Sequence, residues 1–138
     1  MTVTLNPSVD RTISVENLRI GSINRAEFIA ADPGGKGVNV SRALSAYGAQ
    51  TFALLVCAEL GSDWFDRSLT KLSIPHHIIK AEGITRSNIT LVESDGAVTK
   101  LNEPGFALTN EVMQELRQTL DSLDLKGSWV VFAGRLNP

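Results

Sequence analysis

Residues 32–42, which read Asp-Pro-Gly-Gly-Lys-Gly-Val-Asn-Val-Ser-Arg, constrain the fold of this chain more than any other segment. They place three glycines around Lys36, immediately before apolar residues that recur at helical spacing in residues 36–47. Glycine has no Cβ, so the turn can adopt positive φ angles and let another group approach the backbone closely. The helix leaves unpaired N–H groups at its amino end, and together with Lys36 these suit a phosphorylated or hydroxyl-rich small molecule.

Apolar segments that alternate with helical patterns indicate an α/β fold. Residues 52–57 are apolar on both faces, which is typical of a parallel strand covered by helices on each side, and residues 129–133 form a second such segment. Residues 64–72 have helical spacing, and Thr109 is placed to cap a third helix. The inner stripes predicted for the three helices are Val40, Ala43, Leu44 and Tyr47, then Trp64, Phe65, Leu69 and Leu72, and finally Val112, Met113, Leu116, Leu120 and Leu123.

A different pattern in the middle of the chain predicts a second, smaller sheet. Residues 87–93 and 97–102 alternate between apolar and polar on either side of a Ser-Asp-Gly turn, as in an antiparallel hairpin. Residues 11–15 and 25–31 also have an extended pattern, and Asp10 is predicted to lie in the turn before them. Together these strands could cover a cleft.

Composition excludes several classes of protein. The 138 residues are 43% hydrophobic and 20% charged, as in one ordinary globular domain, and the net charge of −2 gives no general attraction to nucleic acid or anionic membranes. No apolar run is long enough for a transmembrane helix, and the first residues do not read as a signal peptide, so we expect a cytoplasmic protein. Cys57 is the only cysteine, which excludes an internal disulfide. His76 and His77 have no ligand partners at metal-binding spacing, so we expect no metal site.

The glycine turn matches the dinucleotide fingerprint G-x-G-x-x-G only in part. Gly35 and Gly37 match its first two glycines, and Glu59 lies near the position of the ribose-binding acid. Val40 replaces the third glycine, and the Asp-Pro pair of residues 32–33 interrupts the strand that should enter the turn. A dinucleotide-binding domain is therefore the less favoured alternative. A P-loop is excluded, because no Ser or Thr follows a Gly-Lys pair at the required spacing.

Three segments together resemble the PfkB family of ribokinase-like carbohydrate kinases. Leu-Asn-Pro-Ser-Val-Asp in residues 5–10, the glycine turn in residues 33–42 and Thr-Arg-Ser-Asn in residues 85–88 are similar to the N-terminal half of that family, in the same order. The branch they resemble most is that of 1-phosphofructokinase and tagatose-6-phosphate kinase. The resemblance implies the N-terminal half only of a ribokinase-like, Rossmann-like three-layer α/β core. It also implies that residues 11–31 and 86–103, approximately, form a small antiparallel β lid, which closes over the sugar and pairs two subunits as a homodimer.

The same resemblance implies an ATP-dependent kinase that uses Mg²⁺ to phosphorylate a sugar phosphate, with fructose 1-phosphate converted to fructose 1,6-bisphosphate as the favoured reaction. In the family, residues at the positions of Asp10 and Asn39 hold sugar hydroxyls, and those at the positions of Lys36 and Arg86 point at the substrate phosphate. This chemistry is sound, because carboxylates and amides recognise hydroxyls, whereas guanidinium and ammonium groups recognise a phosphate. The substrate-binding residues implied in this way are Asp10, Gly34, Gly35, Lys36, Asn39, Arg86, Asn88 and Arg135. Tagatose 6-phosphate and fructose 6-phosphate stay open as substrates.

The chain departs from the family in what it lacks. The family's catalytic aspartate lies in a Gly-x-Gly-Asp motif of the C-terminal half, with most of the ATP and Mg²⁺ sites, and nothing in these 138 residues matches that motif. We therefore expect no catalytic residue here, weak binding and no turnover by this chain alone. The alternative is a truncated, non-catalytic paralogue that binds a sugar phosphate. Residues 134–138, Gly-Arg-Leu-Asn-Pro, stand where the family has Gly-Ser-Leu-Pro, so Arg135 is either a variant phosphate contact or a solvated arginine.

Overall fold

The computed structural model describes residues 1–135, which form two sheets and three helices. One sheet has the strand order β5-β4-β1-β8 and the other β3-β2-β6-β7. The elements are β1 (Thr2–Thr4), β2 (Ser8–Val15), β3 (Glu27–Gly34), α1 (Lys36–Ala46), β4 (Ala53–Ala58), α2 (Glu59–Lys71), β5 (His76–Ile84), β6 (Ser87–Glu93), β7 (Val98–Asn102), α3 (Asn110–Ser122) and β8 (Val131–Phe132). The α/β prediction is confirmed.

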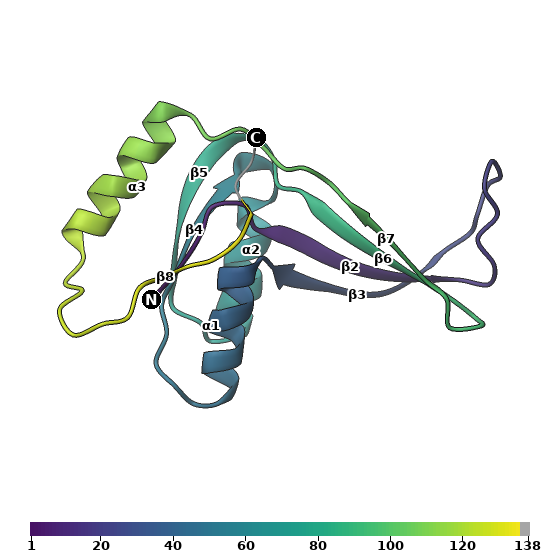
Figure 1. The fold of residues 1–138 in the computed structure, drawn as a ribbon, viewed down its shortest axis with the longest axis horizontal. Helices are drawn as coiled ribbons and strands as arrows, with labels where there is room; N and C mark the ends of the chain where they lie inside the picture. Colours follow the sequence, from purple (N-terminus) through teal and green to yellow (C-terminus); the bar gives the residue numbers. More distant parts are fainter. Residues whose placement is uncertain (136–138) are drawn as a thin grey trace.

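The first sheet is the middle layer of a three-layer core. Its strands are parallel throughout, since β1 pairs with β4 and β8, and β4 pairs with β5. Helices α1 and α2 cover one face of this sheet and α3 covers the other (Figure 1). The three-layer arrangement predicted from the sequence is therefore present.

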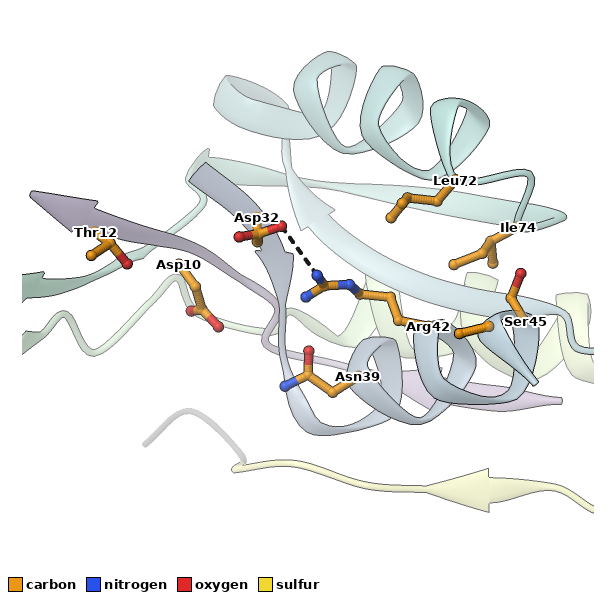
Figure 2. A pocket seen from close by; sticks show the side chains of 9 residues that line it. Asp10, Thr12, Asp32, Asn39, Arg42, Ser45, Leu72 and Ile74 are labelled. Carbon is orange, nitrogen blue, oxygen red and sulfur yellow. Dashed lines mark hydrogen bonds and ion pairs between the residues drawn. The ribbon is translucent and has the colours of Figure 1, made fainter. Parts of the chain in front are cut away.

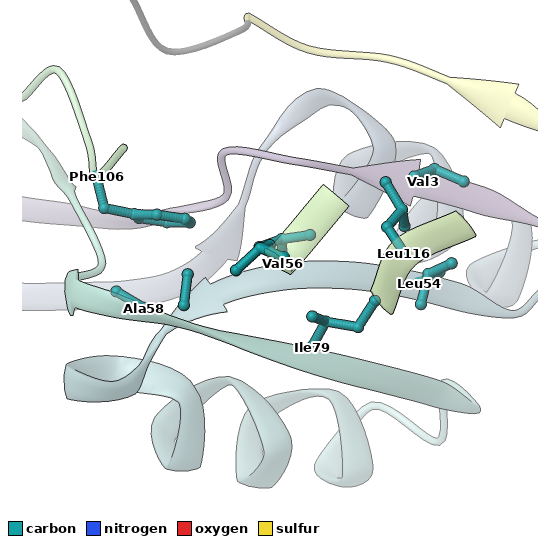
Figure 3. Packing of buried hydrophobic residues seen from close by; sticks show 9 residues of the cluster. Val3, Leu54, Val56, Ala58, Ile79, Phe106 and Leu116 are labelled. Atoms are coloured by element: carbon teal, nitrogen blue, oxygen red, sulfur yellow. The ribbon is translucent and has the colours of Figure 1, made fainter. Parts of the chain in front are cut away.

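Strand β4 shows why residues 52–57 are apolar on both faces. All six residues of β4 are buried, and their side chains enter two different clusters in alternation. Leu54 and Val56 pack with Leu116 on the α3 side (Figure 3), whereas Leu55 and Cys57 belong to the cluster under α1 and α2. Because neither face of β4 meets water, no polar residue is needed on it.

Helix α1 uses a different face from the one predicted. Its buried residues are Gly37, Val38 and Ser41, whereas Leu44 is 37% exposed and Tyr47 is 91% exposed. The helix lies so close to β1 that a Cβ at position 37 would come within 3.0 Å of the carbonyl oxygen of Val3. Small residues therefore form the contact, and the apolar stripe points away from the sheet. The other two stripes supply buried residues as predicted, except that Leu72, the C-cap residue just after α2, is 41% exposed.

Ser41 is a buried polar residue inside this contact. Its hydroxyl lies 2.7 Å from the Thr2 hydroxyl and 2.9 Å from the Thr51 hydroxyl. Buried hydroxyls are tolerated when they are hydrogen-bonded, which explains how a serine can face the core of α1.

The second sheet consists of two hairpins joined side by side. Strand β2 is antiparallel to β3, and β6 is antiparallel to β7, but β2 and β6 run parallel to each other. The predicted antiparallel lid is thus a mixed sheet, and it extends away from the three layers (Figure 1). Asp10 lies within β2 and not in a turn, because β2 begins already at Ser8. Whether this sheet acts as a lid stays a prediction.

Strand β8 is shorter and more exposed than residues 129–133 suggested. It contains two residues at the edge of the sheet and, among the described strands, pairs only with β1. Trp129 is 87% exposed and Phe132 is 60% exposed, so this apolar segment is not buried. Residues 136–138 of the predicted Gly-Arg-Leu-Asn-Pro match lie outside the described part of the chain. Within residues 1–135, no helix has both the length and the apolar character to cross a membrane.

Candidate functional site

The candidate site lies where the two sheets meet. The chain leaves the carboxyl end of β1 to enter β2, and it leaves the carboxyl end of β5 to enter β6. In parallel α/β sheets, ligands bind at this edge. The glycine turn reaches the same place, because Gly34 is the ladder partner of Ser8 and Asp32 is the partner of Asp10.

Asp10 is the centre of a hydrogen-bonded network that joins the two hairpins. Asp10 and Asn88 are partners in the parallel β2–β6 ladder. The Ser8 hydroxyl donates to Asp10 Oδ1 at 2.7 Å, and Asn88 Nδ2 donates to the same oxygen at 2.9 Å. Asn88 Nδ2 also donates to Ser8 Oγ at 3.0 Å. Within residues 1–135, no side chain or backbone group donates to Asp10 Oδ2.

The glycines of the turn are required by the packing of the chain itself. A Cβ at position 34 would overlap the carboxyl group of Asp10. Gly35 has a φ of +109°, and a Cβ there would lie 3.0 Å from Thr4 Cγ2 and 3.1 Å from Pro7 Cα. The sequence suggested that these glycines let a ligand approach, but contacts within the protein already explain them.

Arg86, the residue expected to bind the substrate phosphate, is hydrogen-bonded to Asn88 of this network. Its guanidinium donates to Asn88 Oδ1 at 3.4 Å, to the carbonyl oxygen of Asn6 at 3.3 Å and to that of Glu103 at 3.5 Å, which are all long contacts. Burial lowers the pKa of Arg86, the negative charge of Asp10 raises it, and the positive charge of Arg135 lowers it. Among the described residues, none accepts a hydrogen bond from its buried Nε. Arg86 is therefore influenced by a second cation, Arg135, and its Nε has no hydrogen-bond acceptor among the described residues.

Asp10 and Asn39 line an open hollow of about 780 Å³ (Figure 2). Arg42 of α1 lines the same hollow, where it forms an ion pair with Asp32 at 3.1 Å and donates to the carbonyl oxygen of Pro33 at 3.1 Å. These contacts fix α1 to the end of β3 beside the hollow. A monosaccharide phosphate is small enough to fit this space.

Lys36 does not belong to the hydrogen-bonded network that joins Asp10, Asn88 and Arg86. It is the first residue of α1, exposed, and makes no hydrogen bond or ion pair within residues 1–135. The N-cap residue, Gly35, provides no side-chain hydrogen bond to the end of the helix, and the first turn has no acidic residue. The ammonium group therefore shares the amino end of α1 with uncapped N–H groups, a combination that favours an anion.

Sequence reasoning missed Ser8 and Arg42 as residues of this region. A signal for Ser8 existed, since Ser8, Asp10 and Thr12 alternate along one face of β2. The alternation could not be recognised from residue 8 onward, because the strand was predicted to begin at residue 11 and not at Ser8. For Arg42, no local pattern indicates that a helical arginine reaches back to β3.

The donor set of the described residues does not form a metal site. Within residues 1–135, no group of three or more His, Cys, Asp or Glu residues lies close enough together to hold a metal ion. His76 instead has its Nε2 3.2 Å from Asp66 Oδ1 and its Nδ1 2.8 Å from the carbonyl oxygen of Ile74.

Comparisons with known proteins agree with this geometry. No family model matches the chain. The 1-phosphofructokinase of Xanthomonas campestris is 36% identical over 137 residues, which cover 99% of this chain and 43% of that protein. The crystal structure of Escherichia coli phosphofructokinase-2 in complex with fructose-6-phosphate superposes with a TM-score of 0.91 at 25% identity, covering 99% of this chain and 45% of that one. Its tetrameric inhibited form gives a TM-score of 0.90 at 26% identity, with the same coverage.

The resemblance to PfkB-family kinases is confirmed. It extends over almost the whole chain, although the chain spans less than half the length of these relatives. The dinucleotide alternative lacks its central element, because the strand that enters the glycine turn is β3. This strand belongs to the second sheet and is antiparallel to β2, whereas the dinucleotide fold needs a strand of the parallel sheet there.

Proposed function

We propose that this chain is the sugar-phosphate-binding part of a cytoplasmic, ATP-dependent kinase of the PfkB family. The favoured reaction converts fructose 1-phosphate to fructose 1,6-bisphosphate. The observation that carries this proposal is the network in which Asp10, Asn88 and Arg86 are joined at the carboxyl edge of the parallel sheet, beside the amino end of α1.

Each group in the proposed site has a distinct task. Asp10 accepts a hydrogen bond from a sugar hydroxyl through Oδ2, and the amide of Asn39 bonds a second hydroxyl across the hollow. Arg86, Arg135 and Lys36 bind the phosphate already present on the sugar. Burial is the main cause of the lowered pKa of Arg86, and repulsion by Arg135 adds to it; a dianion bound between the two arginines would relieve that repulsion.

ATP would supply the transferred phosphoryl group, and Mg²⁺ would neutralise its charge. The described residues offer no cluster of His, Cys, Asp or Glu that fits the metal, so no residue among them is assigned to Mg²⁺.

The partner proposed for the second sheet is a second copy of the chain. One face of this sheet carries the polar residues of the site, and the other carries apolar side chains, among them Ile13, Phe28 and Leu101. Phe28 is 65% exposed and Leu101 is 56% exposed, which leaves apolar surface for a homodimer contact. Sedimentation analysis of the wild type and of Phe28→Asp tests this partner: a dimer that Phe28→Asp dissociates supports it, and a monomeric wild type contradicts it.

Calorimetric titration of the chain with fructose 1-phosphate tests the binding proposal. Arg86→Gln should weaken binding about 10- to 100-fold, because hydrogen bonds to charged groups are worth about 1.5–3 kcal/mol. Arg117→Gln, on the exposed face of α3, is the matched control and should bind as the wild type does. Absence of binding to fructose 1-phosphate, tagatose 6-phosphate and fructose 6-phosphate alike would refute the proposal.

An ATP-consumption assay with Mg²⁺ separates the kinase from the non-catalytic alternative. Turnover that requires the sugar phosphate supports the kinase. Binding without turnover, even when the C-terminal part of a related 1-phosphofructokinase is added, supports the sugar-phosphate-binding paralogue.

A further inference from the structure

We propose that Ser8 and Asn88 are positioning residues, which hold Asp10 so that its Oδ2 alone faces the sugar and which set its distance from Arg86. This inference rests on the proposed function, and it changes the role of Asn88 from a substrate ligand to a residue that acts through its neighbours.

Both polar atoms of the Asn88 carboxamide are hydrogen-bonded within the protein. A carboxamide has two N–H donors and one carbonyl oxygen. Nδ2 donates to Ser8 Oγ at 3.0 Å and to Asp10 Oδ1 at 2.9 Å, and the carbonyl oxygen accepts from Arg86 at 3.4 Å. Both polar atoms of the Asn88 side chain therefore already have partners within the protein.

Ser8 has no access to a ligand at all. Its relative exposure is 0%, and its hydroxyl donates to Asp10 and accepts from Asn88. The three side chains therefore form a closed ring of hydrogen bonds in which Asp10 Oδ1 receives two donors. A carboxylate held in this way loses little conformational entropy when it binds a substrate.

Gly34 completes the arrangement from the other side of Asp10. The carboxyl group occupies the space that a Cβ at position 34 would fill, so it is held between the hydrogen-bonding pair and the backbone of the glycine turn. Asn88 then links this fixed carboxylate to Arg86. The spacing between the hydroxyl-binding and phosphate-binding groups is thereby set, and this spacing selects sugar phosphates by the distance between their phosphate and hydroxyls.

The test compares binding of fructose 1-phosphate and of inorganic phosphate by calorimetry. Ser8→Ala should weaken fructose 1-phosphate binding about 5- to 10-fold, the effect of one lost hydrogen bond, and leave phosphate binding unchanged. Asn88→Ala should weaken the binding of both ligands, because it also removes the acceptor of a hydrogen bond from Arg86. Ser14→Ala, on the same face of β2 but outside the network, is the matched control and should change neither.

A double variant shows whether the two residues act through one carboxylate. The double variant Ser8→Ala with Asn88→Ala should lose less binding free energy for fructose 1-phosphate than the two single variants together, since both residues donate to Asp10 Oδ1. Ser8→Cys, which keeps a weak donor, should recover part of the lost affinity. Ser8→Ala with wild-type affinity, or with equal losses for both ligands, would overturn the proposal.

A readout without any sugar distinguishes this inference from the proposed function. Exchange of the Asn88 side-chain N–H groups, followed by NMR, should be slow in the wild type and at least about 10-fold faster in Ser8→Ala, as expected when one hydrogen bond of a ring is lost. If fructose 1-phosphate does not bind the wild type, the proposed function fails and the exchange rates alone decide whether the ring exists. Equal exchange rates in wild type and Ser8→Ala would overturn it.

Discussion

Replacing Gly34 with alanine should displace Asp10 and cost about 2 kcal/mol of folding free energy. The new Cβ would occupy the space of the carboxyl group, and Gly34 lies in β3 without a positive φ, so backbone strain is not the cause. The displaced carboxylate loses hydrogen bonds of 2.7 Å and 2.9 Å, from Ser8 and Asn88. Hydrogen bonds to charged groups are worth about 1.5–3 kcal/mol each, and water replaces part of this at half-buried Asp10.

Urea unfolding followed by circular dichroism measures this effect. With a slope near 2 kcal/mol per molar urea, typical of a chain of this size, the midpoint should fall by about 1 M. The matched background is Asp10→Ala, in which the carboxyl group is already absent and Gly34→Ala should cost at least about 1 kcal/mol less. Equal costs in both backgrounds would show that the overlap with Asp10 is not responsible, and the reasoning would be refuted.

Three further predictions concern the core and α3. Phe65→Ala should cost about 3–5 kcal/mol in urea unfolding, because Phe65 is fully buried and packs edge-to-face on Trp64 at 5.2 Å; a loss below about 1 kcal/mol would contradict this. Burial raises the pKa of the Cys57 thiol to about 12, so a thiol reagent should modify it at mildly alkaline pH only at the rate of unfolding, and rapid labelling of the folded protein would be inconsistent with its burial. A hydrogen bond from its own backbone N–H, and then one from the Thr109 hydroxyl, lower the pKa of Glu111 below 4.5. The stability this provides is present above pH 4.5 and lost as the pH falls through the folded pKa, so Glu111→Gln should be less stable than the wild type at neutral pH but not in strong acid.

The fold could be predicted from sequence where a hydrophobic pattern or a capping residue directly determines the local structure. The apolar run of β4 indicated a strand buried on both sides, and Thr109 accepts a hydrogen bond from the Val112 N–H as a helix cap should. The buried face of α1 could not be predicted in the same way. Its contact with β1 depends on the small size of Gly37 and on a hydrogen-bonded Ser41, and a hydrophobic pattern registers neither.

The candidate site was predictable in its residue types but not in its connections. The family resemblance pointed to Asp10, Arg86 and Asn88 as separate ligands of a substrate. Their hydrogen bonds depend on the register in which β2 lies beside β6, and the two strands are more than 70 residues apart in sequence. Ser8 was left out because the strand was predicted to begin at residue 11, although Ser8 alternates with Asp10 and Thr12 along one face of β2.

The parallel pairing of β2 with β6 has a consequence for how the protein is made. The β2–β3 and β6–β7 hairpins each form from neighbouring residues, but the β2–β6 ladder between them cannot close until the chain has left the ribosome past Glu93. Asp10 and Asn88 lie on opposite sides of that ladder. During synthesis, the nascent chain therefore carries a finished β2–β3 hairpin before it carries a site, and the ability to bind a ligand arises only when β6 pairs with β2.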